Sequence, residues 1–145
     1  MNDIQLYSWD KAEELVYPVT LEVFVKEQGV PIDLELDEYD LKAQHAVFYH
    51  DGFPVGTGRV FKKNFEEDTF YIGRLCVLKK YREMGYGEQI MNSLIQFAKS
   101  HQAKECCLHA QTVSQYFYQK FGFKASGDTF MEAGIEHVVM NLTMA

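Results

Sequence analysis

The sequence has few cysteines, no excess of positive charge and no long apolar run, and each shortage excludes a class of protein. Its 145 residues include three cysteines, and the adjacent pair Cys106 and Cys107 forms neither a disulfide framework nor a Cys-x-x-Cys metal clip. We therefore expect a reducing, cytoplasmic compartment. No His, Cys and carboxylate spacing predicts a metal site. The first residues lack the basic and apolar segments of a leader, and no stretch approaches membrane-spanning length.

The charge balance is acidic, with 14 basic and 21 acidic residues and a formal net charge of −7. This balance disfavours binding to a nucleic-acid backbone or to an anionic membrane surface, and it favours a cationic or amine-bearing partner. Hydrophobic residues make up 47% of the chain. Without an internal repeat or a linker, that composition predicts one domain that spans residues 1–145 and encloses a real core.

The chain is organised around one stretch near its middle. Residues 69–78 form a β-branched and aromatic run that predicts a strand, and a short basic loop with Gly85 and Gly87 follows. Apolar residues then recur at helical spacing: Ile90, Met91, Leu94, Ile95 and Ala98. Strand, glycine loop and helix start together predict a phosphate or pyrophosphate site, because the first N–H groups of a helix lack intrahelical partners. The loop lacks the Gly-Lys-Ser/Thr of a P-loop and the third glycine of the dinucleotide fingerprint.

The other predicted elements cover the rest of the chain. A short strand around Leu6 precedes a helical pattern that Pro18 bends or restarts, and a second helical piece ends at Gln28. Strands are predicted at 45–50, 55–61, 105–110, 124–130 and 137–143, a short helix at 113–121, and tight turns at Asp51-Gly52 and Ala133-Gly134. This order predicts an α/β (α+β) fold, a mixed central sheet of about seven strands packed by about four helices.

Two motifs in the second half of the chain carry a family resemblance. Arg82-x-x-Gly85-x-Gly87 after a strand, followed by Tyr118-x-x-x-Gly122-Phe123, resembles the GNAT superfamily of N-acetyltransferases. The predicted element order is also similar to that of the GNAT fold, so the resemblance covers nearly the whole chain.

The N-terminal half resembles one branch of that superfamily. It contains Phe24-Val-Lys-Glu-Gln-Gly-Val-Pro31, then Glu35-x-Asp37-x-x-Asp40, and then His45. This pattern is similar to that of uncharacterised bacterial acetyltransferases. It is also similar to acyl-homoserine-lactone synthases, which share the fold and an acidic loop.

The resemblance implies an acetyl-CoA site. The backbone of Leu75, Cys76 and Val77 is expected to line the pantetheine slot, with the Val77 N–H polarising the thioester carbonyl. Gln111 and Ser114 are expected beside the pantetheine arm. Tyr118 is expected to protonate the departing thiolate. The residues implied for the pyrophosphate are Arg82, Glu83, Met84, Gly85, Tyr86, Gly87 and Glu88, with Lys79 or Lys80 as further cationic contacts.

The acceptor side is less defined by motif. Amine attack requires a base, and Glu27 and Glu35 are the predicted catalytic carboxylates, with Asp37 and His45 as further candidates for the base or for binding the substrate. Arg59 and Arg74 are predicted to bind a carboxylate or phosphate of the acceptor, or alternatively to pair with the acidic loop. His137 is interpreted as a structural histidine, and the Cys76 side chain as part of the core.

These observations predict an acetyl-CoA-dependent N-acetyltransferase that acts on a small-molecule amine by direct attack in a ternary complex. One alternative is an acyl-CoA-binding sensor without turnover. Another is an acyltransferase similar to acyl-homoserine-lactone synthases. The resemblance also allows a homodimer, because members of this fold often pair through sheet edges or the C-terminal hairpin.

Overall fold

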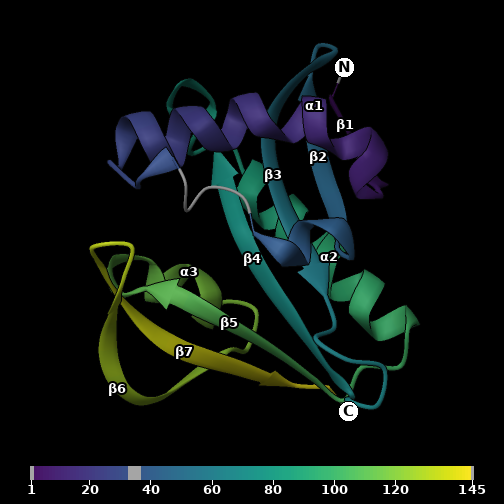
Figure 1. Cartoon of the computed structure of the whole chain (residues 1–145), viewed down its shortest axis with the longest axis vertical. Helices are drawn as coiled ribbons and strands as arrows, with labels where there is room; N and C mark the ends of the chain where they lie inside the picture. Colours follow the sequence, from purple (N-terminus) through teal and green to yellow (C-terminus); the bar gives the residue numbers. More distant parts are fainter. Residues whose placement is uncertain (1, 33–36, 145) are drawn as a thin grey trace.

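The protein is built on one mixed sheet of seven strands in the order β1-β2-β3-β4-β5-β7-β6 (Figure 1). The structure is a computed structural model, and it describes residues 2–32 and 37–144. The strands are β1 (Asn2–Tyr7), β2 (Gln44–His50), β3 (Phe53–Phe61), β4 (Thr69–Val77), β5 (Glu105–Gln111), β6 (Lys124–Glu132) and β7 (Ile135–Thr143). Their neighbours pair antiparallel except for β4 and β5, which run parallel.

The parallel pair divides the sheet into two halves that diverge. Strands β4 and β5 are paired only from Thr69 to Tyr71, opposite 105–107, and beyond that point they separate (Figure 1). Just after the separation, the pairing of β4 with β3 shifts register, and Arg74 adopts a left-handed φ of 55°. A β-bulge of this kind bends and twists its strand. The bulge therefore turns the second half of β4 away from β5.

Helix α2 (Tyr86–Ser100) covers one face of the sheet and carries the predicted apolar stripe. Its Ile90 and Leu94 lie over glycines of β3, where a Cβ added to Gly56 or Gly58 would come within 2.9 Å of their methyl groups. The two glycines therefore allow the helix to pack directly on the backbone of the strand. The main core lies in this layer.

The opposite face is covered by a continuous helical segment at the N-terminus. Helix α1 (Trp9–Thr20) continues without a gap into the π-helical segment η1 (Leu21–Glu27), so Pro18 does not restart the helix, and the change of helix type follows it at Leu21. Pro18 lacks an N–H and so cannot donate to the carbonyl of Glu14, and the Thr20 hydroxyl donates to the carbonyl oxygens of Val16 and Tyr17 at 3.3 and 3.2 Å. The shift to a π register after the proline keeps the chain helical. In the part of the chain that the structure describes there are three α-helices, one fewer than the sequence predicts.

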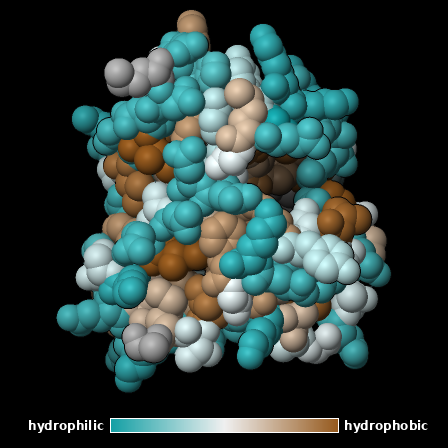
Figure 2. Space-filling view, turned by 180° about the vertical axis from the view of Figure 1, so that it is seen from behind, coloured by the Kyte–Doolittle hydropathy of each residue, from teal (hydrophilic) through white to brown (hydrophobic). Residues whose placement is uncertain are grey.

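The short elements lie at the ends of the strands. They are the 3₁₀ turns η3 (Glu38–Leu41), η4 (Lys79–Tyr81) and η5 (Thr112–Ser114), and helix α3 (Gln115–Gln119), which is shorter than the predicted helix at 113–121. Both predicted hairpin turns are present, and Asp51, Gly52, Ala133 and Gly134 all have positive φ. Among the described residues, no helix is long and apolar enough to cross a membrane. Seen from behind, the surface is mostly hydrophilic, and apolar side chains show between the polar ones in separate small areas (Figure 2).

Candidate active site

Two clefts meet where β4 leaves β5. The large cleft has a volume of about 750 Å³ and lies between the diverging halves of the sheet, and the small cleft has about 400 Å³ and lies at the start of α2. The residues that line both are Leu75, Cys76, Val77, Arg82, Ser114 and Tyr118. The sequence analysis predicts all six for one acyl-CoA site. The structure brings these six residues together.

The small cleft is formed by the glycine loop and the first turn of α2. Gly85 precedes the helix in a left-handed conformation with φ of 81°, and the N–H of Gln89 donates to its carbonyl at 3.2 Å. The N–H groups of the preceding residues therefore belong to the free first turn of the helix, where the dipole is positive. Six predicted pyrophosphate residues line this cleft: Arg82, Glu83, Gly85, Tyr86, Gly87 and Glu88.

The remaining predicted contacts of the loop lie elsewhere. Met84 is 51% exposed, and neither it nor Lys79 nor Lys80 lines a cleft. Besides Arg82, the small cleft is lined by a cation that was not predicted, Lys120, whose ammonium group lies 3.1 Å from the Glu88 carboxylate. The sequence reasoning missed Lys120 because it follows α3, 35 residues beyond Gly85, and nothing local marks it.

Arg82 is held in a fixed direction by two partners. Its two terminal nitrogens donate to the carboxylate of Glu27 at 2.6 and 2.7 Å, and its Nε donates to the carbonyl of Val77 at 2.8 Å. These hydrogen bonds lower the pKa of Glu27. A carboxylate that is kept ionised by a guanidinium is a weak base, so the geometry suits Glu27 to positioning Arg82 and not to the predicted role of base.

Tyr118 lies at the junction of the two clefts. Burial, followed by the nearby Cys76 thiol, raises the pKa of the phenol to about 12. Its ring packs edge-on against Phe117 and Phe123, with ring centroids 5.1 and 6.3 Å away. The hydroxyl therefore stays protonated at neutral pH in a position fixed by packing.

One wall of the large cleft is a network of arginines and aspartates. Arg59, 8% exposed at its side chain, donates to Asp37 at 2.6 and 2.8 Å and to Asp40 at 2.8 Å. Arg74 lies 3.4 Å from Asp37. Burial raises the pKa of Asp37, but the hydrogen bonds and charge of Arg59 outweigh burial and lower it overall. The alternative prediction, that the arginines pair with the acidic loop, matches this geometry.

Two other acceptor-side predictions have a different outcome. His45 is buried against Trp9, donates through Nε2 to the Asp40 carbonyl at 2.9 Å and does not line either cleft, so the structure separates it from the site. Burial lowers its pKa. Glu35 lies outside the described residues.

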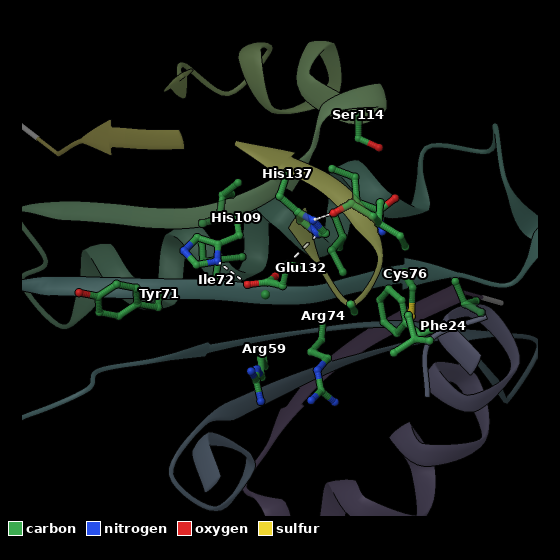
Figure 3. A pocket seen from close by; sticks show the side chains of 18 of the residues that line it. Phe24, Arg59, Tyr71, Ile72, Arg74, Cys76, His109, Ser114, Glu132 and His137 are labelled. Carbon is green, nitrogen blue, oxygen red and sulfur yellow. Dashed lines mark hydrogen bonds and ion pairs between the residues drawn. The ribbon is translucent and has the colours of Figure 1, made fainter. Parts of the chain in front are cut away.

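The opposite wall of the large cleft carries a cluster that the sequence reasoning missed. His109 of β5 donates through Nδ1 to Glu132 Oε1 at 2.9 Å, and His137 Nε2 lies 3.7 Å from Glu132 Oε2 (Figure 3). Figure 3 shows this cluster on one side of the cleft and Arg59 and Arg74 on the other. His137, interpreted from the sequence as a structural histidine, is buried and also lines this cleft.

The two ends of the large cleft differ in chemistry. At one end the Gln111 amide donates to Gln28 at 3.0 Å, which links β5 to the residue after η1. At the other end Tyr39 stacks on Phe61 with ring centroids 4.6 Å apart, and Phe61 stacks on Tyr71 at 5.7 Å. The lining of the cleft therefore includes both an amide pair and a row of aromatic rings.

Comparisons with known proteins identify the family of this chain. The acetyltransferase (GNAT) domain family matches residues 10–144. The chain belongs to the GNAT acetyltransferase family. It is 41% identical over 120 residues to the uncharacterised N-acetyltransferase YjcF of Bacillus subtilis. The aligned region covers 82% of this chain and 84% of YjcF.

Solved GNAT structures share the fold. An acyl-CoA N-acyltransferase from Pseudomonas aeruginosa superposes with a TM-score of 0.86 at 27% identity, covering 97% of this chain and 99% of that one. A GNAT family acetyltransferase from Elizabethkingia anophelis with acetyl-CoA bound superposes with a TM-score of 0.69 at 17% identity, covering 99% of this chain and 98% of that one. This GNAT protein is an acyltransferase with the predicted mixed α/β fold.

Proposed function

We propose that this protein transfers the acetyl group of acetyl-CoA to the amine of a small molecule, by direct attack while both substrates are bound. The observation that carries the proposal is the meeting of two clefts at Leu75, Val77 and Tyr118. A donor in one cleft and an acceptor in the other would present their reacting groups to each other at this junction. Holding two reactants in this way replaces a bimolecular step by an effectively unimolecular one.

The donor side fits an acyl-CoA. The first turn of α2 offers backbone N–H groups at the positive end of a helix dipole, and Lys120 adds a cation on the facing side. A Cβ added at Gly85 would meet nothing within 4 Å, so the space beside this glycine is open to a ligand, and one added at Gly87 would meet the Phe117 ring at 3.5 Å. The fold neighbour from Elizabethkingia anophelis holds acetyl-CoA. We assign the pyrophosphate to the small cleft on these grounds.

The residues at the junction suit the chemistry of thioester cleavage. The diverging half of β4 no longer pairs with β5, so its backbone is available to a pantetheine arm. Tyr118 carries a proton that burial prevents it from losing, and that proton can pass to a departing thiolate. Acetyl-CoA supplies the activated acyl group, and the protein supplies position and the proton.

The acceptor side fits a small molecule. A cleft of about 750 Å³ is within the range of small-molecule sites. Its walls carry both charges, with arginines and aspartates on β3, β4 and the acidic loop and a histidine–glutamate cluster opposite. Glu132 gives an ammonium group a carboxylate to approach, because its side chain is 48% exposed.

The experiment is a measurement of thiol release from acetyl-CoA with a panel of amines, polyamines, amino acids and S-adenosylmethionine. The proposal predicts amine-dependent release of CoA and one N-acetyl product per thiol, detected by mass spectrometry. Binding of acetyl-CoA without turnover on any acceptor would indicate a sensor. Turnover only with S-adenosylmethionine and a longer acyl donor, with lactone formed, would indicate the synthase-like alternative.

A further inference from the structure

The tautomer of His137 is set by its own hairpin. The Nδ1 atom lies 2.7 Å from the carbonyl oxygen of Ile135, and a carbonyl can only accept, so Nδ1 carries the hydrogen. In the neutral ring Nε2 then has no hydrogen and offers a lone pair. The ring is held from the side by Phe130, which stacks on it with centroids 6.0 Å apart. His137 therefore presents a fixed basic nitrogen to the large cleft.

Glu132 faces that nitrogen with an atom that is also an acceptor. Its Oε1 receives the hydrogen bond from His109, and this bond lowers the pKa of the carboxyl, which keeps the group ionised. Its Oε2 lies 3.7 Å from His137 Nε2, which is too far for a direct hydrogen bond. Glu132 Oε2 and His137 Nε2 are both hydrogen-bond acceptors, so neither can donate to the other. A primary ammonium group placed between them can donate a hydrogen bond to each.

We propose that His137 is the proton acceptor for the acceptor amine and that Glu132 holds the ammonium group before the proton moves. This assignment rests on the proposed function and extends it to the acceptor side. It also defines the substrate as one with a primary or secondary ammonium group, bound between β6 and β7 with the rest of the molecule directed along the cleft.

An ammonium N–H proton passes to His137 Nε2, and the neutral nitrogen attacks the thioester carbonyl, so that a C–N bond forms and the C–S bond breaks. The departing thiolate takes a proton from the Tyr118 hydroxyl, and the second nitrogen proton restores the phenol. His137 finally releases its proton to water. The net products are the amide, the CoA thiol and one proton.

Other charged groups face the same space and set the conditions for the test. Beyond Glu132 and His109, the large cleft is lined by titratable or charged side chains from the acidic loop, β3, β4, β5, α3 and the loops: Asp37, Arg59, Lys63, Tyr71, Arg74, Cys76, Arg82, Cys107 and Tyr118. Arg59 and Arg74 are engaged with Asp37. Glu132 is the carboxylate that the structure places beside His137, with Oε2 at 3.7 Å from Nε2.

The test is the pH dependence of kcat/KM for the best amine of the panel in three proteins, the parent, His137→Asn and His101→Asn. An asparagine amide nitrogen can replace Nδ1 as the donor to Ile135 and lacks a counterpart of Nε2, so the hairpin contact is kept while the base is removed. His101 is the matched control, because it lies at the end of α2, stacks on Phe97 with centroids 4.0 Å apart and lines neither cleft.

We expect His137→Asn to lose about 10²-fold in kcat/KM at pH 7, the scale of general-base catalysis. The loss should shrink as the pH rises toward 9.5, because alkaline solution supplies the neutral amine without a base. His101→Asn should follow the parent. Glu132→Gln should raise the KM for the amine, because the ammonium group loses its anionic partner. The rise in the thermal unfolding midpoint that acetyl-CoA causes should stay unchanged.

Two results would overturn the assignment. A loss in His137→Asn that is the same factor at every pH would show a structural role, and an unchanged kcat/KM at pH 7 would show no role. Both results can be distinguished from failure of the proposed function. In that case the parent protein itself would bind acetyl-CoA and acetylate none of the amines.

Discussion

The carboxylate of Glu27 accepts two hydrogen bonds from the guanidinium of Arg82, at 2.7 and 2.6 Å, across 55 positions of sequence. The contact joins the end of η1 to the loop that precedes α2. Because Arg82 also donates to the Val77 carbonyl, the glycine loop, the end of β4 and the N-terminal helix meet at this one side chain. The pair therefore fixes the shape of the junction between the clefts.

Glu27→Gln separates positioning from base catalysis. The hydrogen bonds from Arg82 lower the pKa of Glu27, so its carboxylate is a weak base. We expect kcat/KM for the amine to decrease as the pH is lowered in this variant, as it does in the parent. The free energy of unfolding should change by less than about 1 kcal/mol, because a pair that is about one third exposed is screened by solvent. If this decrease at low pH disappeared in Glu27→Gln and remained in His137→Asn, Glu27 would be the base.

Asp37 predicts a stability that depends on pH. Its folded-state pKa lies below the usual aspartate value because Arg59 outweighs the effect of burial. The stabilisation is therefore fully present above the usual aspartate pKa of about 4 and is lost as the pH falls through the lower folded value. Asp37→Asn should be less stable than the parent at pH 7, and the two should converge in acid. Asp37 caps the 3₁₀ turn η3. Asparagine can serve as a cap as well, so the substitution mainly removes the negative charge.

Chemical denaturation at several pH values measures this difference, with Glu38→Gln as the control at an exposed neighbouring carboxylate. The control should follow the parent. A constant gap between Asp37→Asn and the parent from pH 7 to pH 3 would show that the charge of Asp37 does not stabilise the acidic loop.

Gly87→Asp tests the donor site at the start of α2. The added Cβ meets only the Phe117 ring at 3.5 Å, and an acidic residue in the first turn of a helix is favourable, so the unliganded protein should lose less than about 1 kcal/mol. The new carboxylate lines the small cleft and repels a pyrophosphate. Acetyl-CoA at about a hundred times its Kd adds roughly 2.7 kcal/mol to the parent, which raises the thermal midpoint by several degrees. Most of that shift should disappear in the variant.

Gln89→Glu is the matched control for this measurement. It places the same charge in the same turn, at an exposed position that lines neither cleft. We expect it to retain most of the shift. Equal shifts in the parent, Gly87→Asp and Gln89→Glu would place the nucleotide outside the small cleft.

Much of the fold and of the small cleft could be predicted from the sequence because their signals are local. Glycines at 85 and 87, the helical stripe that begins at Ile90 and the turn at Asp51-Gly52 each act within a few residues, and the structure has the predicted element at each place. The π continuation after Pro18 could not be read in this way, because it depends on how the helix packs on the sheet.

The acceptor wall could not be predicted because it depends on the register of distant strands. His109 and Glu132 are 23 positions apart, and β6 and β7 shift register between Ser126 and Phe130 before Glu132 reaches the cleft. No spacing in the sequence encodes that shift. Arg82 and Glu27 are likewise brought together by the fold, and each alone resembles a free surface charge.

Tyr118→Phe tests the proton donor. Removing the hydroxyl leaves the ring packing against Phe117 and Phe123, so stability and the midpoint shift with acetyl-CoA should stay close to those of the parent. We expect kcat to fall by about 10²-fold, the scale of general-acid catalysis. Tyr116→Phe, in the same helix and 82% exposed, is the control and should have no effect. An unchanged kcat in Tyr118→Phe would remove the tyrosine from the chemistry.

The measurement that tests the central account most directly is the initial rate of thiol release with both acetyl-CoA and amine varied. The two clefts meet at Leu75 and Tyr118. The proposed function places both substrates in these clefts before transfer, so double-reciprocal plots should give lines that intersect. Parallel lines, with an acetylated protein found by mass spectrometry when the amine is left out, would show that the acyl group passes through the protein and would contradict direct attack.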